Sequence, residues 1–193
     1  LFRSTTTKFV PDGSYLLDEV KIRTDQKNIR PSFLRMYVRQ NPNAKWFSLI
    51  KTQLYVYNLS GRDSTKWGNK FLRRIGDAPV IYSEDEAQRS EEEITKAVYN
   101  MGYMAATVKR STKVKKKKIK VYYDVTAGKP YVVQSIKYDI YDPKIAALLK
   151  QDSARSLLKE GMYFDVNVLD ADRQRITNKL LRNGYYKFNK DYI

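Results

Sequence analysis

The segment Ile94-Thr95-Lys96-Ala97-Val98-Tyr99-Asn100-Met101-Gly102-Tyr103 predicts the end of a helix and the start of a strand, and the fold class follows from it. Ser83 is a favourable N-cap for that helix, and acidic residues fill the first turn after it, near the positive end of the helix dipole. Gly102 is the residue type that commonly ends a helix. Two alternating segments, 103–113 and 118–125, follow and predict a hairpin with its turn at 114–117.

The same pattern occurs again 82 residues later. The matching positions are Ser83 and Asp165, Ile94-Thr95 and Ile176-Thr177, Val98 and Leu180, and Gly102-Tyr103 and Gly184-Tyr185. The strand predicted at 131–138 repeats the pattern of residues 15–22, at an offset of 116 residues. The two offsets differ by 34 residues, so the first unit is expected to carry an insertion of about that length. Each unit then runs strand, helix, helix, Gly-Tyr, strand.

These repeats divide the chain into three parts. Residues 1–14 are Ser/Thr-rich, carry a Pro-Asp-Gly turn signal, and are expected to be a tether. Residues 15–129 form the first domain, with its insertion at about 43–78. Residues 130–193 form a second domain that is truncated, because its last strand is missing. Further elements are expected as a strand at 15–23, helices at 31–40, 83–101, 143–150 and 166–183, and a helical turn at 70–75.

Composition narrows the classes of function. The chain has 193 residues, a formal net charge of +16, and neither cysteine nor histidine. The missing residue types exclude catalytic triads and dyads that use them, and the usual zinc sites. No glycine-rich phosphate loop is present, so we predict no enzyme, no metal and no cofactor. No apolar run is long enough to span a membrane, no signal peptide is visible, and Leu1 suggests that an upstream segment has been removed.

The predicted hairpin is very basic. Eight cations occur on it without an intervening acid: Lys109, Arg110, Lys113, Lys115, Lys116, Lys117, Lys118 and Lys120. Such a cluster is suited to phosphate-bearing lipid headgroups or to an acidic partner. A solvated hairpin tip is the competing interpretation, and the sequence leaves both open.

The insertion has an apolar patch that also has two interpretations. Its residues are Trp46, Phe47, Leu49, Ile50, Leu54 and Tyr55. They form either an exposed docking surface or the contact that packs the insertion on its own domain.

Several of these motifs resemble the POTRA domains of BamA- and TamA-type outer-membrane assembly and translocation proteins. The resemblance is carried by Gly102-Tyr103-Met104-Ala105-Ala106-Thr107-Val108 and by the strand and turn at 121–130. The segments 8–17 and 72–82 look like TamA-like surface antigens of Bacteroides-type bacteria. The resemblance covers about residues 8–193, and its individual motifs are short. It implies an α+β fold of two tandem β-α-α-β-β units, each a small mixed three-stranded sheet covered by two helices, the second unit incomplete.

The resemblance also implies a function. It indicates a periplasmic scaffold joined to a C-terminal membrane barrel, with unfolded outer-membrane proteins or accessory assembly proteins as partners. Such relatives are often lipoproteins, although this chain has no cysteine for an N-terminal lipid. Binding would use β-augmentation at an edge strand, here Ala105, Thr107, Lys109 and Ser111, while the Gly-Tyr pairs 102–103 and 184–185 have structural roles. An edge that is only solvated and protected by its lysines is the alternative.

A basic nucleic-acid-binding protein is the main rival. The charge and the 16 tyrosines favour it. It is disfavoured because the cations outside the hairpin are scattered and no nucleic-acid motif appears, so no specific nucleic acid is expected.

Overall fold

The computed structural model describes residues 5–45 and 50–193. The chain divides into two compact units. Residues 1–95 with 107–126 make up unit 1, and residues 96–106 with 127–193 make up unit 2.

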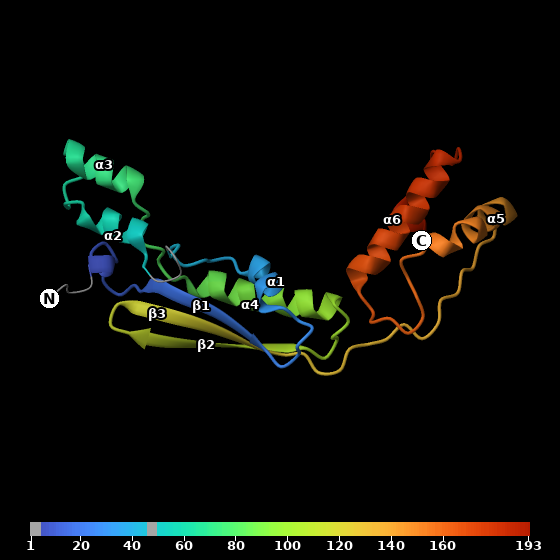
Figure 1. Cartoon of the computed structure of the whole chain (residues 1–193), viewed down its shortest axis with the longest axis horizontal. Helices are drawn as coiled ribbons and strands as arrows, with labels where there is room; N and C mark the ends of the chain where they lie inside the picture. Colours follow the sequence, from blue (N-terminus) through green and yellow to red (C-terminus); the bar gives the residue numbers. More distant parts are fainter. Residues whose placement is uncertain (1–4, 46–49) are drawn as a thin grey trace. The chain divides into compact units, whose positions relative to one another are not determined.

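Unit 1 is built on a three-stranded mixed sheet (Figure 1). Its strands are β1 (Leu16–Thr24), β2 (Thr107–Lys115) and β3 (Lys118–Thr126), in the spatial order β1-β3-β2. β1 runs parallel to β3, and β2 runs antiparallel to it. The predicted α+β class and the predicted β-α-α-β-β order with a mixed sheet are thereby confirmed for this unit.

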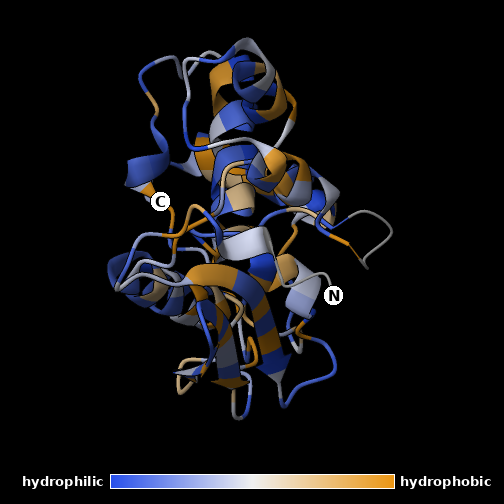
Figure 2. Cartoon of the chain, turned by 90° about the vertical axis from the view of Figure 1, so that its left-hand side faces the viewer, coloured by the Kyte–Doolittle hydropathy of each residue, from blue (hydrophilic) through white to orange (hydrophobic). Residues whose placement is uncertain are grey.

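One face of the sheet packs on α4 (Glu84–Asn100), which lies along it in Figure 1. Side chains alternate between the two faces of a strand, and Figure 2 shows this as hydrophobic and hydrophilic bands along the strands. Ala87 and Ile94 of α4 are buried, and the Tyr123 hydroxyl donates a hydrogen bond of 3.1 Å to the Ala87 carbonyl. The Ser83 hydroxyl accepts from the N–H of Glu86, which confirms the predicted N-cap.

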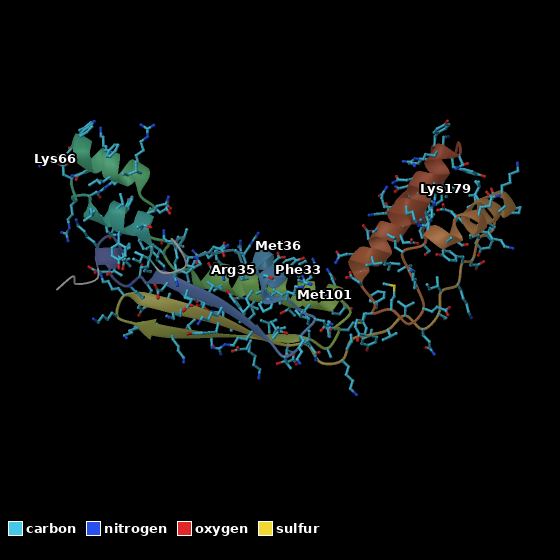
Figure 3. The ribbon with its side chains drawn as sticks, viewed as in Figure 1. Phe33, Arg35, Met36, Lys66, Met101 and Lys179 are labelled. Atoms are coloured by element: carbon cyan, nitrogen blue, oxygen red, sulfur yellow. The ribbon has the colours of Figure 1, made fainter. Side chains whose placement is uncertain are left out.

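The helix predicted at 31–40 is shorter than expected. Only α1 (Pro31–Leu34) is α-helical, and the 3₁₀ turn η2 (Arg35–Tyr37) follows it (Figure 3). The chain then extends, because tertiary hydrogen bonds replace helical ones. The Arg39 N–H donates to Ser90 Oγ at 2.9 Å, and the Gln40 amide donates to the Ile81 carbonyl at 2.7 Å.

The insertion holds a pair of helices, α2 (Thr52–Leu59) and α3 (Trp67–Ile75). The predicted helical turn at 70–75 belongs to α3, whereas α2 was not expected. Leu54 of α2 is buried in one cluster with Val10 and Leu16. The predicted patch residues Trp46, Phe47 and Leu49 lie outside the described residues.

The segment expected as a tether contacts α2. It contains the 3₁₀ turn η1 (Thr5–Thr7) and the buried Val10. The Lys8 ammonium donates to the carbonyl of Ser60 at 2.6 Å and to that of Asn58 at 3.3 Å. Residues 5–10 therefore pack against α2 through both apolar and polar contacts.

Unit 2 contains α5 (Pro143–Gln151), the 3₁₀ turn η3 (Ser153–Arg155), α6 (Val166–Arg182) and the 3₁₀ turn η4 (Lys190–Tyr192). The Asp165 carboxylate accepts from the Asn167 N–H at 2.7 Å, which confirms the second predicted N-cap.

The strands predicted for unit 2 are wrong for the described residues. Segment 131–138 makes only one isolated bridge, between Val132 and Tyr163, and residues after Tyr185 form turns. The physical reason is that a strand needs a neighbouring strand to complete its ladder of hydrogen bonds. Here Val133 bonds only to the loop that precedes α6, at Met162 and Gly161.

Candidate functional site: the β2 edge and its basic hairpin

β2 is an outer strand of the sheet. All nine of its residues pair with β3, from Thr107 opposite Thr126 to Lys115 opposite Lys118. In the described ranges no strand pairs with its other edge. Three of the predicted edge residues, Thr107, Lys109 and Ser111, lie in β2 and are exposed.

Ala105, the fourth predicted edge residue, lies outside the strand, so the prediction is wrong for this residue. It is part of a turn in which the Ala106 N–H donates to the Tyr103 carbonyl at 3.0 Å. The turn uses the backbone groups that strand pairing would need, so β2 begins at Thr107.

The two faces of β2 have different environments. Val108 is buried and Arg110 is half-buried on the face toward α4. The Arg110 guanidinium donates to carboxylates on α4, Glu84 and Glu91 (3.2 Å to the latter), and to the Tyr82 hydroxyl at 2.9 Å. These bonds fasten the edge strand to the helix, and they mean that Arg110 does not add to the exposed charge of the hairpin.

The same cluster shifts two pKa values. The hydrogen bond from Arg110, followed by the one from Tyr82, lowers the pKa of the Glu84 carboxyl. Burial, followed by the hydrogen bond that its hydroxyl donates to Glu84 at 2.5 Å, raises the pKa of Tyr82 to about 12. Both shifts favour the ionised acid and the neutral phenol that hold Arg110.

The hairpin tip is tighter than the predicted turn at 114–117. Lys115 pairs with Lys118, which leaves only Lys116 and Lys117 in the turn. Lys116 has a positive φ of 56°, a left-handed conformation that costs about 1–2 kcal/mol in a residue with a Cβ atom. Lys117 forms an ion pair of 2.7 Å with Asp12.

Like charges face one another along the hairpin. Lys113 lies opposite Lys120, as Lys115 lies opposite Lys118. Lys120 is paired with Glu19 at 2.7 Å. Within the part of the chain that the structure describes, four of the predicted tip lysines have no ion pair: Lys113, Lys115, Lys116 and Lys118.

The ring of Tyr122 lies on the face of the sheet away from α4, close to two cations. Tyr122 is 8% exposed, with the Arg23 guanidinium 4.6 Å and the Lys113 ammonium 5.8 Å from its ring centre. A cavity of about 920 Å³ opens beside it. It is lined by Thr7, Asp18, Val114, Tyr122 and the lysines 113, 115, 116, 117, 118 and 120. This arrangement of cations can hold an anion.

Both predicted Gly-Tyr pairs end a helix in the same way. Gly102 and Gly184 have positive φ values of 91° and 93°, and each following tyrosine N–H reaches back to the carbonyl five residues earlier. The bonds run from Tyr103 to Val98 (3.3 Å) and from Tyr185 to Leu180 (3.1 Å). A Cβ atom on Gly102 would stand 2.2 Å from the Phe164 carbonyl oxygen, whereas one on Gly184 would meet open space.

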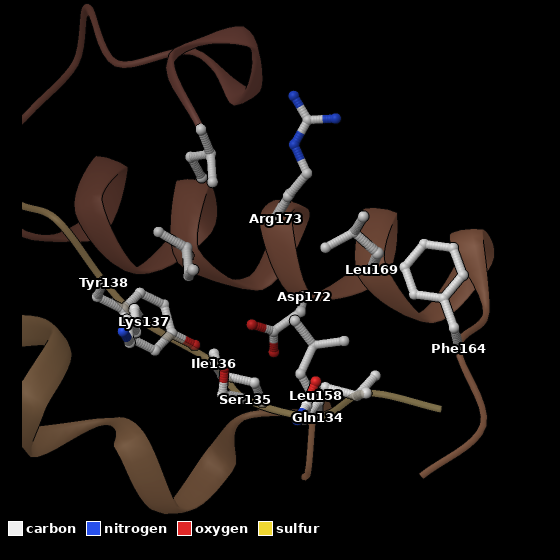
Figure 4. Close-up of a pocket in the computed structure, with 13 residues that line it drawn as sticks. Gln134, Ser135, Ile136, Lys137, Tyr138, Leu158, Phe164, Leu169, Asp172 and Arg173 are labelled. Atoms are coloured by element: carbon white, nitrogen blue, oxygen red, sulfur yellow. The ribbon is translucent and has the colours of Figure 1, made fainter. Parts of the chain in front are cut away.

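A second cavity lies within unit 2, between segment 133–138 and α6 (Figure 4). It has a volume of about 490 Å³ and is lined partly by apolar side chains such as Ile136 and Leu169. Asp172 on its wall is buried, accepts from the Leu157 N–H at 2.7 Å and is paired with Arg175 at 2.8 Å. Its bonds are thus structural and leave no free acid in the cavity.

Within residues 5–45 and 50–193, no group of three or more acidic residues could hold a metal ion. None of the helices in those ranges is both long and apolar enough to cross a bilayer.

Comparisons with known proteins give one family. Its model, described as POTRA, surface antigen variable number repeat, matches residues 15–128. Seven chains of solved structures match. One is the POTRA1-2 region of the periplasmic domain of Omp85 from Anabaena, at 14% identity and a TM-score of 0.37, covering 89% of this chain and 82% of that one. Another is Haemophilus influenzae BamA POTRA3-5, at 14% identity and a TM-score of 0.32, covering 92% and 89%. The comparison with curated proteins gives no match.

Proposed function

The chain belongs to the POTRA family, and we propose that it is a periplasmic scaffold of an outer-membrane assembly or translocation protein, which binds client polypeptides by β-augmentation. POTRA domains are not catalytic, so the function is one of binding. The client segment adds as a fourth strand at the free edge of β2 (Thr107–Lys115).

The observation that carries this proposal is the difference between the two outer strands of the sheet. The start of β1 is covered, because the Leu17 N–H donates to the Val80 carbonyl and the Tyr82 N–H to that of Tyr15, both at 2.8 Å. The edge of β2 has no such cover among the described residues. A strand with unpaired N–H and C=O groups is a template for another strand.

The direction of the β2 side chains supports an edge that stays open to an incoming strand. Side chains of a strand project above and below the sheet, and the hydrogen-bonding groups point along its plane. Lys109 and Lys113 therefore lie on the open face rather than in the path of an incoming strand. Because backbone pairing depends little on sequence, one edge can accept many clients.

The partners follow from the family and from the charge. Unfolded outer-membrane proteins or accessory assembly proteins pair with the edge, and the parent chain continues into a membrane barrel. The unpaired lysines at 113, 115, 116 and 118 contact anionic lipid headgroups or an acidic partner. More specifically, we propose that the parent protein is a TamA-like surface antigen that is held at the outer membrane and carries an N-terminal lipid.

Backbone hydrogen exchange of the 193-residue chain tests the edge. The ligands are peptides of about ten residues with alternating apolar side chains, the length of one barrel strand. Amides that point outward from β2 should gain protection at every second residue, while amides of β1 should not change. Protection elsewhere, or none, would contradict the proposal.

A pair of proline variants supplies the matched control. Neighbouring N–H groups of β2 point to opposite edges, so Ser111→Pro and Thr112→Pro remove one inward and one outward donor. The proline that removes an inward donor breaks a hydrogen bond to β3 and should lower the stability of the fold. The proline that removes an outward donor should leave the circular dichroism spectrum unchanged and abolish peptide binding. Salt-dependent binding of nucleic acid, with no peptide protection, would favour the basic nucleic-acid-binding alternative instead.

A further inference from the structure

Helix α3 packs on the rest of unit 1 through the polar side chains of Asn69 and Arg73, with Leu72 also half-buried. Asn69 accepts from the Gly61 N–H at 2.7 Å and donates to the Asp63 carbonyl at 2.6 Å. The Arg73 guanidinium donates to the Gly61 carbonyl at 3.0 Å and lies 5.0 Å from the ring centre of Phe9. These inward residues recur at the helical spacing of four, so they mark one face of the helix.

The apolar side of α3 points away from the domain. Trp67, Phe71 and Ile75 are 81%, 50% and 47% exposed. They are also spaced by four residues, and at 100° per residue their stripe lies across the helix from Asn69 and Arg73. The Trp67 and Phe71 rings stack 5.9 Å apart, so the stripe is continuous. An ordinary surface helix has the reverse arrangement, with its apolar stripe toward the core.

Cations border this stripe. Lys66 at the start of the helix (Figure 3), Lys70 and Arg74 are all exposed. In the sequence from 60 to 76 five cations accompany a single carboxylate, that of Asp63. The carboxylate accepts from both the N–H and the hydroxyl of Thr65, so it is directed toward its own loop.

We propose that the Trp67/Phe71/Ile75 stripe of α3 is a membrane-docking surface that lies in the interface of an anionic phospholipid bilayer. An exposed aromatic stripe flanked by lysine and arginine is the pattern of helices that rest at the headgroup boundary. Tryptophan suits that boundary, because its ring is apolar and its N–H is polar. The bordering cations match the negative surface potential of such a bilayer.

Charge complementarity favours a bilayer over a second copy of this chain. A copy with the same net charge of +16 would bring cations against the cations of α3. The surface also lies on a different element from β2, so the proposal does not depend on edge pairing. The α3 variants below leave Thr107–Lys115 unchanged, and failure of one proposal leaves the other standing.

Vesicle flotation of the whole chain tests the proposal. The probes are vesicles of pure phosphatidylcholine and of equimolar phosphatidylcholine and phosphatidylglycerol. Binding should require the anionic lipid, and the double variant Trp67→Ala/Phe71→Ala should bind about tenfold less. The control, Met36→Ala/Tyr141→Ala, removes exposed apolar side chains from other elements and should bind as the unchanged chain does.

A charge arm accompanies the apolar one. Lys70→Glu/Arg74→Glu should reduce binding far more than Lys27→Glu/Lys144→Glu, which makes the same change of net charge at other exposed positions. Equal losses in the two pairs would show only a general charge effect and would overturn the proposal.

Fluorescence locates the stripe directly. In a Trp46→Phe background Trp67 is the only tryptophan, and its emission should shift to the blue and be quenched by brominated lipid chains. Binding without that shift would place another surface on the membrane and overturn the proposal. A dimer in the absence of vesicles that Trp67→Ala/Phe71→Ala dissolves would assign the stripe to self-association instead.

Discussion

Lys113 of β2 lies directly opposite Lys120 of β3, so the β2-β3 hairpin holds two like charges at one cross-strand position. Glu19 on β1 pairs with Lys120 at 2.7 Å, and Lys113 has no ion pair among the described residues. Directly opposed like charges destabilise a sheet. The hairpin thus keeps a positive charge at a cost in stability, which is expected where the charge itself has a role.

Lys113→Glu should raise the free energy of unfolding by about 0.2–1 kcal/mol, because it turns a like-charge pair into an opposite-charge pair. Urea unfolding followed by circular dichroism measures it. Lys27→Glu, at an exposed turn position, is the control for the change of net charge. A loss of stability at Lys113 alone would show that repulsion across the hairpin is not significant.

Lys116→Asn should also stabilise the chain, by up to about 1 kcal/mol, because asparagine tolerates the left-handed region better than lysine does. Lys116 has a φ of 56° in the two-residue turn. Lys116→Gln removes the same charge at the same position without the tolerance of asparagine for the left-handed region, and it should give a smaller gain. Thermal unfolding of both variants decides the point, and equal effects would mean that charge rather than backbone strain is responsible.

Regular, local patterns could be predicted from the sequence. Alternation located all three strands of unit 1, and Ser83 and Asp165 marked the starts of α4 and α6, because these signals depend on neighbours in the sequence. The Gly-Tyr pairs likewise marked both helix ends, which share a positive glycine φ.

Features that depend on distant residues could not be predicted in this way. α1 ends early because Ser90 and Ile81, about fifty and forty positions away, bind the chain after it. The prediction of strands in unit 2 was wrong because an alternating sequence does not by itself supply a neighbouring strand to pair with.

In the candidate site, charge counting alone could not separate Arg110 from the lysines. Its partners Glu84 and Glu91 lie on another element, and only the fold brings them together. The α3 stripe did leave a signal, since Trp67, Phe71 and Ile75 recur every four residues. Nothing in that spacing says which side of a helix faces its domain.

Gly102→Ala should destabilise the chain at least twice as much as Gly184→Ala. Both glycines have left-handed φ values near 90°, which cost a residue with a Cβ atom about 1–2 kcal/mol. At Gly102 the new Cβ would also stand 2.2 Å from the Phe164 carbonyl oxygen, which must move. Denaturant unfolding compares the two variants at matched positions of the repeat, and equal losses would mean that the backbone near Phe164 yields freely.

Tyr82 should make the stability of the chain depend on alkaline pH. Burial, followed by its hydrogen bond to Glu84, raises the pKa of Tyr82 to about 12 in the folded state, compared with about 10 in an unfolded chain. The contribution is therefore complete below about pH 10 and is lost as the pH rises toward 12, because the unfolded state releases the proton first. Tyr82→Phe should flatten this decline in urea unfolding measured across that range. Tyr141→Phe, at a ring that is 95% exposed, should leave it unchanged. If the free energy of unfolding of Tyr82→Phe declined equally steeply over this pH range, other groups would be responsible for the decline, and Tyr82 would not contribute to it.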